Sequence, residues 1–274
     1  MNKTYQILPP KGLVRIDLGE LWRFRELFFV FVWRDFKVRY KQTALGILWA
    51  IFQPFVTMLI FSIFFGKLAQ LPSDDIPYPI FVYSGLLFWN YFVSALSNAS
   101  NSLVDNENIV KKIYFPRLIL PISTLVTPII DFVCAFVVLL GIMLYYHYTP
   151  SVLGIALIPI LLLFSLLSAS GLGVLFASVN VKFRDIRFIL PFFIQLLLFL
   201  TPVIYPISLI PQPYQWILYI NPMSSVITVA RSFLIGGASV QPSLIMLSVA
   251  VTAIFVFVGI IYFRSTERLI TDAL

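Results

Sequence analysis

The stretch "RDFKVRYKQTALGILWAIFQP", residues Arg34–Pro54, decides the fold class of this chain. Its first eight positions are rich in cations, and no charged side chain follows before Lys67. The four cations are Arg34, Lys37, Arg39 and Lys41. A helix that crosses a bilayer needs about 20 mostly apolar residues, and Lys and Arg gather at its cytoplasmic end. The boundary therefore predicts the entry of a first transmembrane span.

The composition agrees with a membrane protein. The chain of 274 residues is 60% hydrophobic and 11% charged, whereas a soluble domain carries roughly 25% charged residues. A soluble core cannot hide that much apolar surface, so lipid is the expected solvent. The net charge of +7 does not indicate nucleic acid, because the basic residues flank apolar runs and hold loops in the cytoplasm.

Hydropathy predicts an all-α polytopic membrane protein with six transmembrane helices. The spans are expected at residues 44–66, 79–104, 118–146, 152–179, 188–204 and 244–263. Residues 1–43 form a cytoplasmic segment before a transmembrane domain that covers 44–274. Residues 205–241 are apolar but broken by Pro and Gly, which predicts a re-entrant helical hairpin at the outer face, between spans five and six.

The distribution of Lys and Arg fixes the predicted orientation. Nine of them precede the first span, three lie in the loop 105–117, three lie between spans four and five, and two follow the last span. Only Lys67 and Arg231 fall on the other side. Both termini are therefore expected in the cytoplasm.

An amphipathic helix is predicted before the first span. Apolar side chains with helical spacing recur at Leu21, Phe24, Phe28 and Phe31. Another face, interrupted by Val30, carries Arg23, Glu26, Arg34, Lys37 and Lys41, and Arg39 adds to the basic residues of the helix. This pattern favours a helix in the cytoplasmic headgroup layer. Its role is either a simple anchor to anionic lipid or a contact for a partner protein.

A polar stripe follows one face of the second span. Its members, Asn90, Ser94, Ser97, Asn98 and Asn101, fall at i, i+4, i+7, i+8 and i+11. Polar groups are costly in lipid, so this face must meet protein or water. Hydrogen bonding between helices and the wall of a wet pathway both explain it. Small residues at Ser165, Ala169, Gly173 and Ala177 on the fourth span indicate close helix packing.

Aromatic side chains gather on two other spans. The fifth carries Phe188, Phe192, Gln195 and Phe199 along one face, and the first carries Trp49, Phe52 and Phe55. Such a face is usually a lipid or core surface. Gln195 argues against a face that meets only lipid. Aromatic rings can also stack weakly on sugar rings, which makes these residues candidates for a translocation pathway together with Asn90, Ser94 and Asn98.

Asp131 is the one acidic residue deep in a predicted span. An intramembrane carboxylate suggests a functional site, but a hydrogen bond to a neighbouring helix explains it more simply. No basic residue accompanies it within a span, which is poor support for a proton relay.

Enzymatic motifs are missing from the sequence. No G-x-x-x-x-G-K-[ST] segment occurs, so ATP binding by that motif is not expected. His147 is the only histidine, and its tyrosine-rich surroundings suit the membrane interface. An acidic pair such as Asp74 and Asp75 can ligate a metal in a membrane glycosyltransferase, but their loop is too short to hold an acceptor. The sequence predicts no catalytic residue, no metal site and no cofactor bound by this chain.

Five segments together resemble a known family. "RYKQTALGILWAIFQP" (39–54) resembles the entry to the first span of ABC-2-type transporter permeases, in the branch that exports polysaccharides such as O-antigen and teichoic acid. "NENIVKKIYFPRLILP" (106–121) and "NVKFRDIR" (180–187) resemble its cytoplasmic loops. "TPVIYP" (201–206) and "YINPMSSVITVARSFLIGG" (219–237) resemble its outer re-entrant region. The motifs occur in the family's order and cover nearly the whole chain.

The resemblance implies a permease of the bacterial plasma (inner) membrane. It implies a homodimer of permeases with two nucleotide-binding ATPase subunits, which hold ATP and Mg²⁺. The implied substrate is a polyprenyl-pyrophosphate-linked polysaccharide that passes from cytoplasm to periplasm or cell exterior, along the aromatic faces of spans one and five. The coupling segment would dock on the ATPase through Glu107, Asn108, Ile109, Val110, Lys111, Lys112, Ile113 and Tyr114.

Three alternatives share part of this pattern. An ABC-2 permease for drugs or small lipids would have the same fold, although the "RYKQTALG" and "YFPR" segments suit the polysaccharide branch better. A membrane glycosyltransferase would need Asp74 and Asp75. A lipid scramblase would move the glycan without any ATPase.

Overall fold

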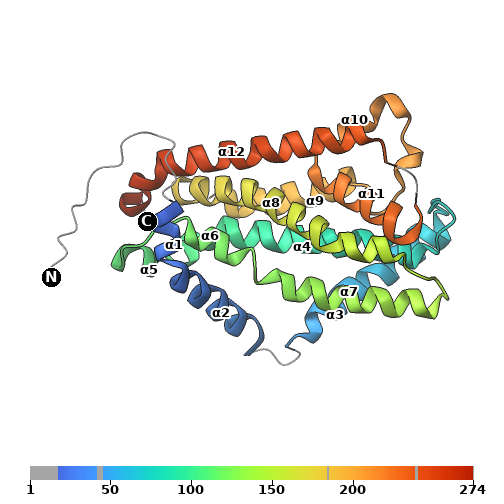
Figure 1. Cartoon of the computed structure of the whole chain (residues 1–274), viewed down its shortest axis with the longest axis horizontal. Coiled ribbons are helices and arrows are strands. Elements are labelled where there is room, and N and C mark those ends of the chain that lie inside the picture. The colour runs from blue at the N-terminus through green and yellow to red at the C-terminus, as the bar shows by residue number, and fades with distance from the viewer. Residues whose placement is uncertain (1–17, 42–45, 184, 238–239, 274) are drawn as a thin grey trace.

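A computed structural model describes residues 18–41, 46–183, 185–237 and 240–273, and these form helices and no strand. The long helices run along the long axis of the molecule (Figure 1). The helices are α1 (Leu18–Arg23), α2 (Arg25–Lys41), α3 (Leu48–Phe61), α4 (Tyr78–Asp105), α5 (Glu107–Lys112), α6 (Ile119–Thr124), α7 (Pro128–Tyr145), α8 (Val152–Lys182), α9 (Ile186–Leu200), α10 (Gln215–Tyr219), α11 (Pro222–Ile235) and α12 (Pro242–Ala273).

Five described helices are long and apolar enough to cross a membrane. They cover Leu48–Leu68, Tyr78–Asp105, Ile119–Tyr145, Val152–Lys182 and Pro242–Glu267. The first joins α3 to a π-helical segment, Ser62–Leu68, and the third joins α6 to α7. These five match the predicted spans one, two, three, four and six.

The predicted fifth span, 188–204, is occupied by a shorter helix. Helix α9 has 15 residues and ends at Leu200, below the roughly 20 that a straight span needs. Thr201 has an extended backbone and Pro202 follows it. A residue before proline disfavours helical geometry, so the helix stops here although the apolar sequence continues.

Helix α4 is the centre of the fold. In its most apolar window 78% of residues are buried, against 11% for the first span and 17% for the last. It packs closely against α8 at Gly173. If Gly173 carried a Cβ, that atom would lie only 2.7 Å from the Cβ of Ala99, so a larger residue does not fit there. The small-residue stripe is buried at Ser165, Ala169, Gly173 and Ala177, which confirms the prediction that it serves packing.

Helices α8 and α12 also approach closely, at a pair of glycines. A Cβ on Gly171 would lie 2.6 Å from the Val256 backbone nitrogen, and a Cβ on Gly259 would meet the Gly171 carbonyl oxygen. Glycines at both positions allow the two backbones to touch, the arrangement that membrane helices use in place of a hydrophobic driving force.

The N-terminal helices rest on protein rather than on lipid alone. Phe31 is buried in a cluster with Phe115 and Val110, and Leu21, Phe24 and Phe28 pack around this cluster. The face that predicted a contact with headgroups thus covers α6 and the segment before it. A different set of apolar side chains on α1 and α2 is exposed, namely Trp22, Phe29, Val30, Trp33 and Val38.

At the opposite end, α10 and α11 form a pair bent by 114°. Asn221 caps α11, because its side-chain oxygen accepts a hydrogen bond from the Met223 backbone nitrogen at 3.1 Å. Its amide nitrogen also donates to Thr201 Oγ1 at 2.7 Å, which ties the bend to the end of α9. The bent pair lies within the Pro- and Gly-rich region 205–241.

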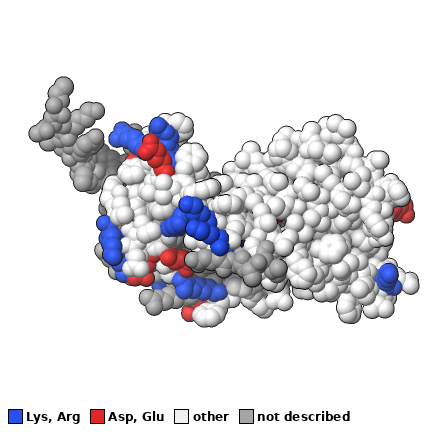
Figure 2. Space-filling model, turned by 90° about the horizontal axis from the view of Figure 1, so that it is seen from below, with Lys and Arg blue, Asp and Glu red and all other residues white. Residues whose placement is uncertain are grey.

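Charged residues are unevenly distributed along the molecule. Figure 2 shows most of them on this face at the end that carries α1, α2 and α5, next to a wide uncharged body with few charges at the far end. Such a division is what a membrane protein with one charged, aqueous end requires.

Candidate functional site

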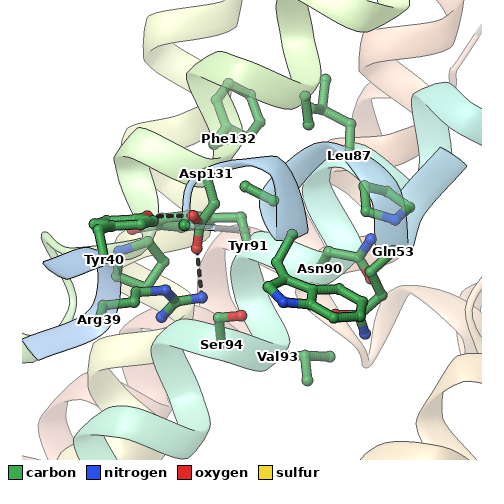
Figure 3. A pocket seen from close by; sticks show the side chains of 16 residues that line it. Arg39, Tyr40, Gln53, Leu87, Asn90, Tyr91, Val93, Ser94, Asp131 and Phe132 are labelled. Atoms are coloured by element: carbon green, nitrogen blue, oxygen red, sulfur yellow. Dashed lines mark hydrogen bonds and ion pairs between the residues drawn. The ribbon is translucent and has the colours of Figure 1, made fainter. Parts of the chain in front are cut away.

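A pocket of about 180 Å³ opens between the C-terminal end of α2 and helices α3, α4 and α7. Figure 3 shows side chains from all four helices pointing into it. Its walls are formed by Arg39, Tyr40, Gly46, Trp49, Ala50, Gln53, Pro54, Leu87, Asn90, Tyr91, Val93, Ser94, Pro128, Asp131, Phe132 and Ala135. The pocket therefore collects three predicted pathway residues, Trp49, Asn90 and Ser94, and leaves the others outside.

Asp131 has partners on α2. Its carboxylate forms an ion pair with Arg39 and accepts a hydrogen bond from the Tyr40 hydroxyl (Figure 3). The partner does not contradict the expectation that no basic residue accompanies Asp131 within a span. The cation comes from the end of the predicted interfacial helix, 92 positions earlier, and not from another span. The simpler interpretation of Asp131, as a group bonded to a neighbouring helix, is supported.

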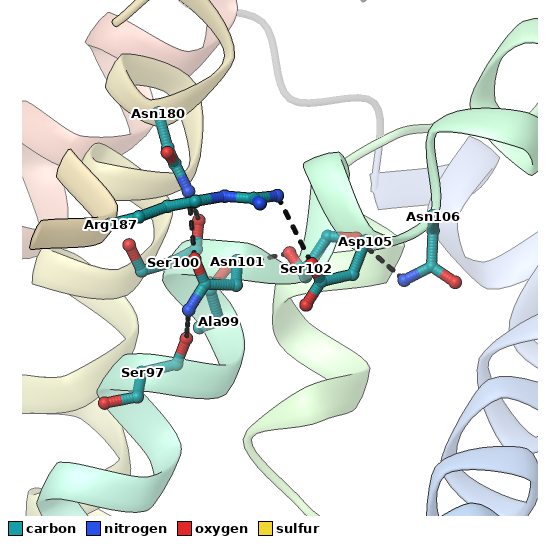
Figure 4. A network of polar contacts seen from close by, with 9 residues as sticks. All are labelled: Ser97, Ala99, Ser100, Asn101, Ser102, Asp105, Asn106, Asn180 and Arg187. Carbon is teal, nitrogen blue, oxygen red and sulfur yellow. Dashed lines mark hydrogen bonds and ion pairs between the residues drawn. The ribbon is translucent and has the colours of Figure 1, made fainter. Parts of the chain in front are cut away.

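The polar stripe on α4 divides into two parts with different surroundings. Toward its C-terminal end, Asn180 of α8 donates to the Ser100 carbonyl and to Asn101 Oδ1, both at 3.1 Å. Asn101 in turn donates to the Ser97 carbonyl at 3.0 Å. Figure 4 shows this network between the two helices. Here the stripe is used for helix packing.

The other part of the stripe faces the pocket. Asn90 and Ser94 line it, together with Gln53 of α3. Within the described part of the chain, no side-chain hydrogen bond joins any of these three groups to protein. Asn98 is half-buried between the two parts.

The aromatic faces lie on the surface of this single chain. Phe188, Phe192 and Phe199 of α9 are 81%, 63% and 57% exposed, and Gln195 is exposed beside them. On α3, Trp49 and Phe52 are about half exposed and Phe55 is 37% exposed. Helices α3 and α9 both pack against α4. The two faces are thus available to lipid, to a substrate or to another chain.

The predicted coupling segment forms the short helix α5 at the charged end (Figure 1). Asn108, Lys111, Lys112, Ile113 and Tyr114 are exposed. Glu107 and Ile109 are half-buried, and Glu107 pairs with Lys111. Val110 is only 4% exposed and packs against the chain's own cluster. Ile113 and Tyr114 therefore remain as the apolar side chains that a partner can contact.

Tyr114 links this segment to α1, because its hydroxyl donates to Glu20 at 3.2 Å. Partial burial and the neighbouring Glu20 carboxylate raise the pKa of Tyr114. Of the basic residues predicted for the interfacial helix, Arg34 pairs with Asp35, Lys37 lies over the Trp33 ring, and Lys41 is exposed.

Arg231 is a residue whose importance the charge pattern does not reveal. It is 4% exposed, and its guanidinium donates to the carbonyls of Pro202 at 2.5 Å, Val203 at 2.7 Å and Phe81 at 2.9 Å. It also lies 3.5 Å from the centre of the Phe81 ring. Charge counting treats it as an outer cation, whereas it fastens α11 to α4 and to the end of α9. A single arginine inside the apolar run "VITVARSFLI" is the signal that points to it.

One member of the acidic pair Asp74 and Asp75 has a structural use. Asp74 accepts a hydrogen bond from Ser208 at 2.7 Å, which joins two loops at the end of the molecule opposite α1 and α5 (Figure 1). Among the residues that the structure describes, no group of three or more His, Cys, Asp or Glu side chains is arranged to hold a metal ion.

Comparisons with known proteins place these features in context. Residues 26–235 match the ABC-2 type transporter family. The chain is 30% identical to the O-antigen export system permease protein RfbA of Klebsiella pneumoniae over 224 residues, 82% of this chain and 85% of that one. It is 32% identical to the protein of that name from Myxococcus xanthus, over 76% of this chain and 80% of the relative. It is 25% identical to the polysialic acid transport protein KpsM of Escherichia coli, over 86% of this chain and 91% of that one.

Proposed function

The chain belongs to the ABC-2 type transporter family, and from this premise we propose that it is the permease subunit of an exporter of lipid-linked polysaccharide. The observation that carries the proposal is the extent of the likeness. Relatives named for O-antigen export and polysialic acid transport align over 76% to 86% of the chain. ATP is hydrolysed by a separate ATPase subunit, and the permease supplies the route.

The proposed topology has six crossings. Helix α9 makes the fifth with the apolar residues 201–204 that follow it, and the bent pair α10–α11 enters and leaves the outer leaflet as a re-entrant hairpin. Two observations support this arrangement. The bend of 114° suits a turn within the membrane, and Arg231 satisfies the carbonyls of Pro202 and Val203, which would otherwise be unpaired where the backbone leaves helical geometry.

The charged end is proposed to be cytoplasmic and to carry the ATPase contact. The exposed side chains of the α5 segment, Ile113 and Tyr114 with Lys111 and Lys112 beside them, are suited to a groove on a partner. Movement imposed there would reach α1 through Tyr114 and Glu20. It would reach α12 through Arg117, which donates to the Glu267 carbonyl.

The translocation pathway is proposed to lie between two copies of the permease, along α3 and α9. The support is the exposure of their aromatic side chains in a single chain. Rings such as Phe192 and Phe199 offer a tolerant surface on which successive sugars can slide. A homodimer would cover these faces from both sides.

The test is transport in vesicles that hold the permease and its ATPase. A lipid-linked glycan is added on the face that carries the ATPase, and a membrane-impermeant glycosidase inside the vesicles reports its arrival. We expect cleavage that requires ATP and both subunits. Transport of small amphiphilic dyes without transport of the glycan would identify a drug or lipid permease. Arrival of the glycan without the ATPase would identify a scramblase.

A further inference from the structure

We propose that the pocket between α2, α3, α4 and α7 binds one neutral sugar residue of the glycan, within a single permease chain. The inference rests on the proposed function and adds a recognition site to it. This site is separate from the aromatic faces of α9. Its elements are three polar side chains without a protein partner, an aromatic wall, and a carboxylate neutralised by a guanidinium.

The polar side chains are available to a ligand. Asn90 and Ser94 lie 15 and 11 positions before the end of α4 at Asp105, which places them roughly 16 to 22 Å along the helix from its charged end. At that depth an unsatisfied amide or hydroxyl is costly. Gln53 faces the same space from α3. Amide groups donate and accept at once, which matches the hydroxyl groups of a sugar.

The remaining walls favour a sugar over water alone. Trp49, Tyr91 and Phe132 line the pocket beside the polar groups, and Figure 3 shows aromatic and amide side chains sharing one space. Water needs only polar partners. A pyranose ring presents hydroxyl groups at its edge and apolar C–H groups on its face. An aromatic wall complements that face, and a few polar groups fix the orientation, as in other ligand sites.

Charge distinguishes a sugar from a phosphate. Arg39 and Asp131 form an ion pair at the edge of the pocket, so their formal charges cancel. An anionic phosphate would have to compete with Asp131 for the guanidinium. A neutral hydroxyl can instead use the lone pairs of the carboxylate that Arg39 and Tyr40 leave open.

The volume limits the ligand to a single ring. The pocket measures about 180 Å³. Pockets for drug-sized molecules begin near 300 Å³. One sugar residue is therefore accommodated, while the rest of the chain must extend beyond α3 or remain outside.

The experiment uses the permease–ATPase complex in lipid nanodiscs without glycan, with 5-fluorotryptophan in the permease. The permease has five tryptophans, and the ¹⁹F resonance of Trp49 is the one lost in Trp49→Phe. Glucose, galactose, mannose and N-acetylglucosamine are titrated separately, and inorganic pyrophosphate serves as the anionic probe. We expect a saturable shift of the Trp49 resonance with at least one sugar and none with pyrophosphate.

Variants test whether the shift reports this pocket. Gln53→Leu and Asn90→Leu should each weaken the apparent affinity for the sugar by about tenfold, the effect of losing one well-placed hydrogen bond. Gln53 is exposed, so its replacement should not disturb folding, which the other tryptophan resonances check. Gln212→Leu is the matched control, because it removes an exposed amide just before α10, outside both the pocket and the proposed pathway, and it should leave the affinity unchanged.

Several outcomes would overturn the inference. These are no shift with any of the sugars, a shift with pyrophosphate instead, or equal affinities in Gln53→Leu and Gln212→Leu. The vesicle assay separates this result from the fate of the proposed function. If the permease exports glycan with ATP but its Trp49 resonance does not shift with any sugar, the sugar site is refuted and the proposed function stands. Sugar binding without any glycan export would refute the exporter and leave the pocket standing.

Discussion

Arg231 and Arg39 both place a guanidinium against apolar helices, but they are held in different ways. Arg231 is 4% exposed, and three backbone carbonyls from two separate segments surround it. The Arg39 side chain is 34% exposed and pairs with the side chain of Asp131. One arginine is enclosed by fixed backbone, and the other meets a side chain at the edge of a pocket.

The difference indicates which end of the molecule is built to move. Backbone acceptors cannot turn away without unfolding a helix or a turn, so the region around Arg231 is a rigid joint. A contact between two side chains can separate and reform at little cost, so α2 can shift relative to α7. The region near Arg39 thus suits a transporter's moving end, and the region near Arg231 suits its fixed end.

Replacing Arg231 should have the largest effect. Arg231→Met would leave the carbonyls of Pro202 and Val203 without their donor, and buried unsatisfied acceptors cost about 1–3 kcal/mol each. The Phe81 carbonyl would still accept from Ser84 Oγ. We expect a loss of about 3–5 kcal/mol in the free energy of unfolding, measured by denaturant titration in detergent micelles. Gly85→Ala probes the same joint without removing charge, because its Cβ would lie 2.6 Å from Arg231 Nη2. Normal stability in both variants would show that the outer joint is not rigid.

Breaking the Arg39 pair should have a smaller effect on stability and a clear effect on export. Arg39→Asp sets two carboxylates against each other, and we expect a loss of about 1–2 kcal/mol, since the pair is partly exposed. The doubly exchanged variant, Arg39→Asp with Asp131→Arg, should recover most of the stability and the ATP-driven export. Failure of this rescue in a folded protein would mean that the contact between α2 and α7 does not matter to transport.

The sequence predicts the long helices well because hydropathy is a local property. The second span, expected at 79–104, is found at Tyr78–Asp105. The early end of α9 is less visible, since apolar residues continue past Pro202 and only the backbone preference of Thr201 stops the helix.

Contacts between distant segments could not be predicted in this way. The pair of Arg39 and Asp131 joins positions 92 apart, and no periodicity within either helix encodes it. The division of the polar stripe has the same origin, because spacing groups Asn90 and Asn101 on one face. Only the position of Asn180 on α8 shows that Asn101 is used for packing while Asn90 faces a pocket.

Ile113, directly after α5, tests whether the charged end carries the ATPase contact. Ile113 is 59% exposed, so Ile113→Asp should change stability by less than about 0.5 kcal/mol. It should nevertheless reduce stimulation of the ATPase by the permease, because a charge would enter the partner's groove. Val110→Asp is the matched comparison: Val110 is buried, so this variant should lose stability outright. Full ATPase coupling in Ile113→Asp would remove α5 from the contact and weaken the assignment of this end as cytoplasmic.

The aromatic face of α9 should give the smallest effect on stability, since Phe192 and Phe199 are 63% and 57% exposed. Phe192→Ala with Phe199→Ala removes two rings from the proposed pathway and little from the core. We expect unchanged unfolding and a severalfold slower export, measured with glycans of increasing length. The loss should grow with chain length, because each added sugar must pass the same surface. Trp216→Ala is a control on another exposed aromatic, 50% exposed on α10. Equal export of long chains by the α9 variant and the control would place the route elsewhere. The region near Arg39 would then act on a pathway that α9 does not border.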